Sequence, residues 1–256
     1  MFDKMIKEGL KKIATEDCDS QNNFINTICT KVRHMDAKVI HDFEGFFVPN
    51  DEYMLKFFGP LILERQLDCY NEFKQCFWLN YLVFPIYNQL DEIVGLTGFN
   101  PINKLKAVEE NDWTLQYYRH SGKSLFDKGK HLFLKRGAYR KALEDNYIIL
   151  TDGVFDTISF AEAGLNSGAL LGSYVSEEII AMLTFIDRIY LAIDNDEAGE
   201  KLLNQLRKRL PHVMAIRQGK FKDADDVLQS KHRQYYLTKI REHIKLRVYY
   251  DLIIKL

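Results

Sequence analysis

Tyr147-Ile148-Ile149-Leu150-Thr151-Asp152-Gly153 opens the part of the chain that decides its fold, and Arg188-Ile189-Tyr190-Leu191-Ala192-Ile193-Asp194-Asn195-Asp196-Glu197-Ala198-Gly199 closes it. In both stretches a run of apolar, largely β-branched residues ends in carboxylates and a glycine, and a helical pattern follows. Such a run is typical of a buried strand that carries acids at its carboxyl end. Because ligands of open parallel α/β sheets bind just past these strand ends, the pattern predicts a ligand site there.

Three of the acids in this region follow strands too closely to belong to solvated helix faces: Asp152, Asp194 and Asp196. Two neighbouring strand ends would bring them together, and unpaired carboxylates at close range repel one another, so a cation is their natural partner. Mg²⁺ prefers one or two carboxylates together with water and substrate phosphates. The sequence therefore predicts a site for Mg²⁺ or Mn²⁺.

Strand and helix patterns alternate downstream of Tyr147, which predicts an α/β fold with a parallel sheet and right-handed crossovers. A tail helix is expected from Gln234 onward, because Ile240, Ile244, Val248 and Leu252 recur every four positions. The first 75 residues read as mostly helical, with loop or turn residues at 45–49 and at Gly59-Pro60. A hairpin is expected from 82–87 and 93–98, and a basic helix over 128–143. We expect a mixed α+β basic domain over 1–145, a metal-binding domain over 146–230 and a C-terminal helix over 231–256.

The near-zero net charge of −1 hides an uneven distribution of charge along the 256 residues. The segment 119–141 has eight Lys or Arg and one acid, and 201–222 has seven basic residues and no acid. Acids at a metal centre with basic flanks suit a polyanion substrate. The four cysteines form no CxxC pair, and no apolar run is long enough to span a bilayer, so a cytoplasmic protein with reduced thiols and no membrane partner is expected.

Two superficial motif matches fail on their required residues. Ser121-Gly122-Lys123-Ser124 looks like the end of a phosphate-binding P-loop, but Tyr117 stands where the first glycine is needed. Asp194-x-Asp196 looks like the start of a calcium loop, but Gln205 stands where the twelfth-position glutamate is needed. Neither nucleotide binding by a P-loop nor calcium binding by an EF-hand is predicted.

Three acidic motifs in order resemble those of a Toprim domain: Thr151-Asp152-Gly153-Val154-Phe155-Asp156, then Asp194-Asn195-Asp196-Glu197-Ala198-Gly199, then Asp223-Ala224-Asp225. The pattern is most similar to bacterial DnaG-type primases, which carry E-G-x-x-D, D-x-D-x-A-G and D-x-D. Upstream, Val83-Phe84-Pro85-Ile86, Ile93-Val94-Gly95-Leu96-Thr97-Gly98 and the segment 125–133 are also similar to primase segments. Each motif alone is weak, but the ordered set over roughly residues 80 to 230 is specific.

The resemblance implies a primase core, an RNA polymerase of primase type that makes short RNA primers on single-stranded DNA from ribonucleoside triphosphates. It implies Asp152, Asp194 and Asp196 as catalytic metal ligands, with Lys128 on the nucleotide-facing wall. Further acids of the implied metal cluster are Asp156, Asp223 and Asp225. The basic residues expected to bind nucleic acid or nucleotide are Lys123, Lys128, Lys130, Lys135, Arg136 and Arg140.

The chain departs from the family pattern at several places. Asp152 replaces the first-motif glutamate, and Tyr87 and Phe99 stand where the family often has arginine. We expect the chain to lack the family's zinc ribbon and its C-terminal helicase-binding domain. The resemblance therefore suggests a short phage, plasmid or mobile-element version that relies on a zinc-ribbon or replicative-helicase partner.

Two other functions stay open beside primer synthesis. A Toprim nuclease would need the same acids but would use water as the nucleophile. A primase-like module without catalysis would bind DNA or a replication partner, and the substitutions at Asp152, Tyr87 and Phe99 favour it.

Overall fold

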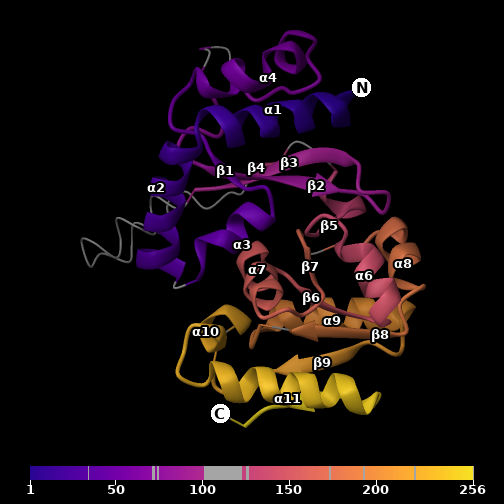
Figure 1. Ribbon diagram of the computed structural model, residues 1–256. Coiled ribbons are helices and arrows are strands. Elements are labelled where there is room, and N and C mark those ends of the chain that lie inside the picture. The colour runs from indigo at the N-terminus through magenta and orange to yellow at the C-terminus, as the bar shows by residue number, and fades with distance from the viewer. Residues whose placement is uncertain are drawn as a thin grey trace. The chain divides into compact units, whose positions relative to one another are not determined.

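The computed structural model describes the chain apart from residues 34, 71, 72, 74, 101–122, 125, 126, 173, 193, 222 and 256. The side chains of residues 32, 33, 123, 124 and 128 also lie outside the described part. The chain divides into two compact units, Met1–Asp127 and Lys128–Leu256 (Figure 1). Across the described residues, no helix has both the length and the apolar character needed to cross a membrane.

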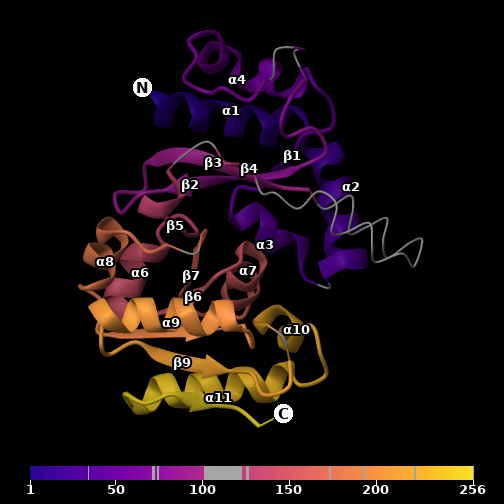
Figure 2. The ribbon, with the colours of Figure 1, turned by 180° about the vertical axis from the view of Figure 1, so that it is seen from behind.

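The first unit is built on an antiparallel sheet in the order β1-β2-β3-β4. Helices α1 and α4 lie on one side of this sheet, and their apolar residues share a core with the strands (Figures 1 and 2). The predicted hairpin is confirmed as β2 paired with β3. The elements are α1 (Phe2–Glu16), α2 (Cys18–Ile28), a π-helical turn (Cys29–Arg33), α3 (Ala37–Asp42), β1 (Phe46–Phe47), α4 (Tyr53–Leu63), β2 (Leu82–Tyr87), β3 (Ile93–Phe99) and β4 (Lys123–Ser124).

Two local predictions in the first unit were wrong. The segment 45–49, expected as a turn, contains strand β1, which pairs with the start of β2. Gly59-Pro60, expected as a loop or turn, lies inside α4. The helical geometry of α4 breaks at Phe58 (φ −127°), so Pro60 falls in the first turn after the break, where its missing N–H needs no partner.

The second unit contains a six-stranded sheet in the order β10-β9-β8-β6-β7-β5, in which every neighbouring pair is parallel except β5 with β7. This confirms the predicted α/β class with a parallel sheet. Its elements are a 3₁₀ turn (Lys128–Lys130), β5 (Leu132–Phe133), α6 (Ala138–Asp145), β6 (Tyr147–Thr151), α7 (Val154–Glu162), β7 (Ser167–Leu170), α8 (Glu177–Leu183), β8 (Arg188–Ala192), α9 (Glu197–Arg209), β9 (Met214–Arg217), α10 (Ala224–Leu228), α11 (Arg233–Leu246) and β10 (Leu252–Ile253).

Both faces of the second sheet are covered by helices, which is why the middle residues of β6 and β8 are apolar. Successive side chains of a strand point to opposite faces. Ile148 and Leu150 of β6 pack with α6, α8 and α9 on one face, whereas Ile149 packs with α7, α10 and α11 on the other (Figures 1 and 2). Polar and charged side chains near this sheet are therefore expected in the loops that follow the strand ends.

Two expectations for the second unit needed correction. Residues 128–143, expected to be a basic helix, include the edge strand β5 before α6 begins. The tail helix α11 ends at Leu246, where Arg247 adopts a left-handed φ of 53°, so Val248 and Leu252 do not continue it. Leu252 and Ile253 instead form β10, which pairs parallel with β9. The spacing of Leu252 from Ile244 fits a helix, but the helix has already ended.

Candidate metal centre

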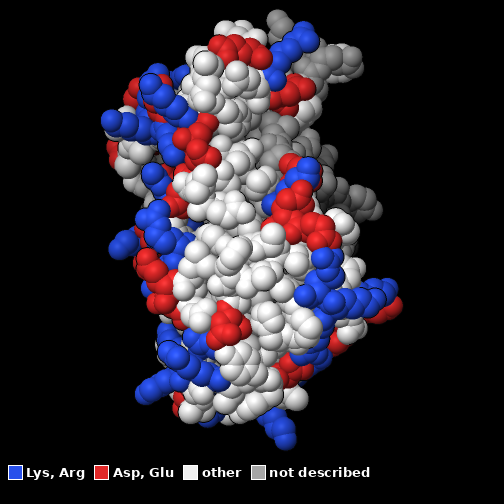
Figure 3. All heavy atoms as spheres, turned by 90° about the vertical axis from the view of Figure 1, so that its right-hand side faces the viewer, with Lys and Arg blue, Asp and Glu red and all other residues white. Residues whose placement is uncertain are grey.

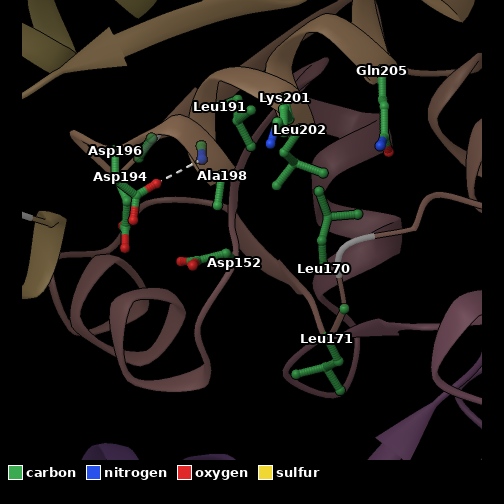
Figure 4. Close-up of a pocket in the computed structure, with 13 residues that line it drawn as sticks. Asp152, Leu170, Leu171, Leu191, Asp194, Asp196, Ala198, Lys201, Leu202 and Gln205 are labelled. Carbon is green, nitrogen blue, oxygen red and sulfur yellow. Dashed lines mark hydrogen bonds between the residues drawn. The ribbon is translucent and has the colours of Figure 1, made fainter.

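A pocket of about 480 Å³ lies past the carboxyl ends of β6, β7 and β8. Its acidic residues come from two strand ends, Asp152 after β6 and Asp194 with Asp196 after β8. Figure 4 shows the Asp152 carboxylate pointing toward the side of the pocket where Asp194 and Asp196 lie. The remaining lining residues are mostly small or apolar: Leu170, Leu171, Gly172, Leu191, Ala192, Ala198, Gly199, Lys201, Leu202 and Gln205.

The turn that carries Asp152 is fixed by threonine hydroxyls beneath it. Thr151 Oγ1 donates to the carbonyl oxygen of Gly153 at 2.8 Å, and it lies 2.7 Å from Thr157 Oγ1 on α7. Both threonines are fully buried, whereas Asp152 itself is exposed. The chain thus leaves β6 in a tight turn that holds the Asp152 side chain at the surface of the pocket.

The loop that carries Asp194 and Asp196 is held from both sides. Asp196 is the N-cap of α9, and its Oδ1 accepts from the Gly199 N–H at 2.8 Å. Between the two acids, Asn195 Nδ2 donates to the carbonyl oxygen of Gly219 at 2.8 Å and to that of Phe221. Asn195 therefore ties the loop after β8 to the loop after β9, which leads to the third acidic motif.

The other predicted ligands form a second, more buried group. Asp156 Oδ1 on α7 accepts from the Asp225 N–H at 2.8 Å, and Ser159 Oγ donates to Asp225 Oδ1 at 2.8 Å. Asp223 is the N-cap of α10, and its Oδ1 accepts from the Asp226 N–H at 2.8 Å. These hydrogen bonds fix the positions of the carboxylates on α7 and α10.

Electrostatic repulsion connects the two groups of acids. The pKa of Asp156 is raised well above its ordinary value, chiefly because burial disfavours the charged form. Three neighbouring carboxylates raise the pKa further: Asp225, Asp223 and Asp152. A positive charge among these acids would relieve the repulsion.

The arrangement suits a cation that keeps water and phosphate in its coordination shell. Within the described residues, no three His, Cys, Asp or Glu side chains are arranged as a ready-made metal cluster. Mg²⁺ usually binds through one or two carboxylates, with water and substrate phosphates completing its octahedron. The hard oxygen donors of Asp152 and Asp194 in an open pocket fit that mode, and a closed all-protein cage is not required.

Among the predicted basic residues whose side chains are described, none lines this pocket. Lys135 and Arg136 line a different pocket of about 300 Å³ together with Asn166 and Ser167, at the amino end of β7. Lys130 and Arg140 are exposed, and the side chains of Lys123 and Lys128 lie outside the described residues. On the face drawn in Figure 3, acidic side chains lie beside many of the Lys and Arg side chains.

Three contributors to the site were missed from the sequence: Asn195, Ser159 and Lys201. Asn195 stands between the two aspartates of the second motif, so its position was a usable signal. Ser159 and Lys201 lie one helical turn into α7 and α9, and only the packing of the helices brings them to the acids.

Position 199 has room only for glycine, and this gives a first prediction. A Cβ atom at this position would lie 2.5 Å from the carbonyl oxygen of Asp194, which is backbone and cannot rotate away. We expect Gly199→Ala to shift the Asp194 loop and weaken Mn²⁺ binding on the order of tenfold or more, because metal geometry is sensitive to small displacements. Isothermal calorimetry measures the affinity, and circular dichroism checks the fold.

Gly172→Ala is the matched control, because Gly172 lines the same pocket but a Cβ there meets nothing within 4 Å. It should leave the Mn²⁺ affinity unchanged. Equal affinities for both variants would contradict the assigned role of the Gly199 contact.

Comparisons with known proteins identify a matching family and similar sequences. A family model described as Toprim-like matches residues 149–228. The DNA primase of Aquifex aeolicus is 27% identical over 182 residues, which cover 68% of this chain and 35% of that protein. The DNA primase of Thermotoga maritima is 30% identical over 156 residues, which cover 59% of this chain and 26% of that protein. The chain thus spans about a third or less of the length of these relatives.

The fold is also that of a solved primase domain. The structure of the DnaG primase catalytic domain bound to single-stranded DNA superposes with a TM-score of 0.66 at 19% identity, covering 92% of this chain and 81% of that one. At this identity the superposition shows a shared fold. It extends beyond residues 149–228, so the likeness is not confined to the Toprim-like segment.

Proposed function

We propose that this chain, which contains a Toprim-like domain and is related in sequence and fold to bacterial DNA primases, synthesises short RNA primers on single-stranded DNA. The observation that carries the proposal is the pocket at the ends of β6 and β8, where Asp152 faces Asp194 and Asp196. The proposed substrates are a single-stranded DNA template and ribonucleoside triphosphates. A replicative helicase or a zinc-ribbon protein is the proposed partner.

The reaction joins a 3′-hydroxyl to an α-phosphate and releases pyrophosphate. A bound Mg²⁺ or Mn²⁺ supplies stabilisation of the negative charge on the attacking and leaving oxygens. Asp152, Asp194 and Asp196 would hold the cation from one side, and their helix caps and loop contacts keep them in place. No protein side chain needs to act as a covalent nucleophile.

We assign roles in cation binding and phosphate neutralisation to the residues around these acids. Asp156, Asp223 and Asp225 would add negative charge behind the pocket and help to hold a second cation. Lys128, at the start of the second unit, would neutralise phosphate charge of the incoming nucleotide. Lys201 lines the pocket and pairs with Glu197 at 2.7 Å, so it can turn to a phosphate when one is present.

The experiment that tests the proposal is incubation of the chain with single-stranded DNA, labelled ribonucleotides and Mg²⁺ or Mn²⁺. Synthesis of ribonuclease-sensitive oligonucleotides supports it. Shortening of end-labelled DNA without any synthesis would instead support the Toprim nuclease, which uses the same acids and a water nucleophile.

A second candidate, a non-catalytic module that binds DNA or a replication partner, is favoured by two structural roles. Tyr87 is buried, and its hydroxyl donates to Glu44 Oε2. Phe99 packs against Phe84 with ring centroids 6.5 Å apart. Both positions, where the family often has arginine, serve the core of the first unit here. This candidate predicts DNA binding without nucleotide transfer under any metal condition.

Binding of template DNA gives a further prediction. Each phosphate that a Lys or Arg neutralises releases counterions, so the affinity for single-stranded DNA should fall steeply with salt, with a slope of about −0.7 per contact. We expect Lys128→Ala to lower nucleotide transfer more than it lowers DNA affinity, because this lysine is assigned to the nucleotide. Fluorescence anisotropy over a salt series and the primer assay measure the two effects.

Lys135→Ala is the comparison variant, because Lys135 lines the pocket at the opposite end of β7 from the acids. It should change the salt slope of DNA binding without a specific loss of transfer. Affinity that does not depend on salt would remove the argument from phosphate contacts.

A further inference from the structure

Two cysteines that the proposed reaction does not use lie together in the core of the first unit. Cys69 has no exposed surface and Cys76 is 6% exposed. The backbone draws their segments together, since the Phe77 N–H donates to the Cys69 carbonyl oxygen at 2.8 Å and Tyr70 forms an antiparallel bridge with Cys76. Neither cysteine is in a disulfide in the structure.

The two thiols are joined by a hydrogen bond and are not equivalent. This hydrogen bond raises the pKa of Cys69 and lowers that of Cys76. Contacts with the backbone at Trp78 and Leu79 also lower the pKa of Cys76. Burial opposes the thiolate at both positions.

Neighbouring contacts hold Cys76 in this position. Its backbone N–H donates to Asp51 Oδ1 at 2.7 Å, and the Tyr70 hydroxyl donates to the carbonyl oxygen of Asp51. The Cys76 carbonyl oxygen accepts from the Leu79 N–H at 3.2 Å, which closes a backbone turn that begins at Cys76. The attacking atom of a thiol reaction would therefore be positioned in advance.

We propose that Cys69 and Cys76 form a redox-active dithiol, which a peroxide converts reversibly into an intramolecular disulfide. Cys76 is the sulfur that reacts first, since it is the more exposed of the two and its backbone is held by Asp51. Cys69 is the resolving thiol, held in contact with it. The sulfurs need only approach from hydrogen-bond contact to the S–S bond length of about 2.05 Å.

The chemistry balances in two steps. The Cys76 thiolate attacks one peroxide oxygen, the O–O bond breaks, and hydroxide leaves and takes up a proton, so that Cys76 becomes a sulfenic acid. The Cys69 sulfur then attacks the Cys76 sulfur, the S–O bond breaks, and the oxygen leaves as water with the thiol proton. Two thiols lose two electrons, and one hydrogen peroxide becomes two molecules of water.

The test treats the full chain with hydrogen peroxide under native conditions, blocks the remaining thiols with N-ethylmaleimide after denaturation, and maps peptides by mass spectrometry without reduction. We expect a Cys69–Cys76 cross-link that dithiothreitol reverses, while Cys29, buried in the same unit, stays fully alkylated. Full alkylation of both Cys69 and Cys76 at peroxide levels that oxidise the exposed Cys18 would overturn the proposal.

Single variants test the order of the two steps. In Cys69→Ser the sulfenic acid at Cys76 has no resolving thiol, so capture by dimedone should increase about tenfold over the wild type. In Cys76→Ser no dimedone adduct should form at Cys69. Equal trapping at Cys69 and Cys76 in the two variants would overturn the assignment of Cys76 as the first sulfur to react. The cross-linking experiment uses the wild type alone, so it does not depend on whether the variants fold. Cys18→Ser is the control that excludes cross-links between chains.

Discussion

Replacing Asp194 and Asp196 together by asparagine should abolish Mn²⁺ binding at the pocket and lower nucleotide transfer at least on the order of a thousandfold. The substitutions remove two negative charges while they keep the size of both side chains. The fold should stay intact, because an asparagine at position 196 can still accept from the Gly199 N–H and cap α9. The loss would thus report on the cation and not on the helix.

The control for this double variant is Glu197→Gln. Glu197 lies next to Asp196 in the first turn of α9, but its side chain is 84% exposed and pairs with Lys201. Calorimetry with Mn²⁺ and the primer assay should show near-wild-type values for this control. Mn²⁺ affinity that survives in the Asp194→Asn, Asp196→Asn variant would rule out this pocket as the metal site.

Asp152 gives the second large effect, because it lies across the pocket from Asp194 and Asp196 (Figure 4). Asp152→Ala should abolish nucleotide transfer. Asp152→Glu tests whether the site is adapted to aspartate. Nucleotide transfer above the wild-type level would indicate a site that lost its glutamate. Transfer below the wild-type level would indicate a site fitted to aspartate. Small misplacement of reacting oxygens can cost about a hundredfold in rate.

We expect wild-type activity to be higher with Mn²⁺ than with Mg²⁺, because Mg²⁺ demands near-ideal octahedral geometry. Primer synthesis by the wild type and by Asp152→Glu, measured with each metal, provides the comparison. If both proteins are inert with every metal and with a zinc-ribbon partner present, the non-catalytic binding module becomes the better account.

The elements that could be predicted from the sequence are those whose local residue pattern matches their environment in the fold. β6 and β8 are apolar because both faces of the sheet are covered, so their ends and the acids that follow could be predicted. The caps made by Asp196 and Asp223 follow from ordinary helix-start chemistry. The carboxylates at the ends of two strands that are neighbours in the sheet therefore lie beside one pocket.

The features that could not be predicted depend on tertiary contacts. β5 and β10 have two residues each, which is too short for any periodicity to show. The spacing of Leu252 fits a helix, and only the left-handed Arg247 and pairing with β9 make it a strand. The hydrogen bond from Ser159 to Asp225 joins residues 66 positions apart, and no local pattern encodes it.

The most direct test of the central claim is template-matched ribonucleotide incorporation by the wild type and by the Asp194→Asn, Asp196→Asn variant. With Mn²⁺ present, labelled GTP should enter short oligoribonucleotides on an oligo(dC) template but not on oligo(dT), and the variant should make none. Incorporation that ignores the template, or that persists in the variant, would contradict the assignment of this pocket to primer synthesis.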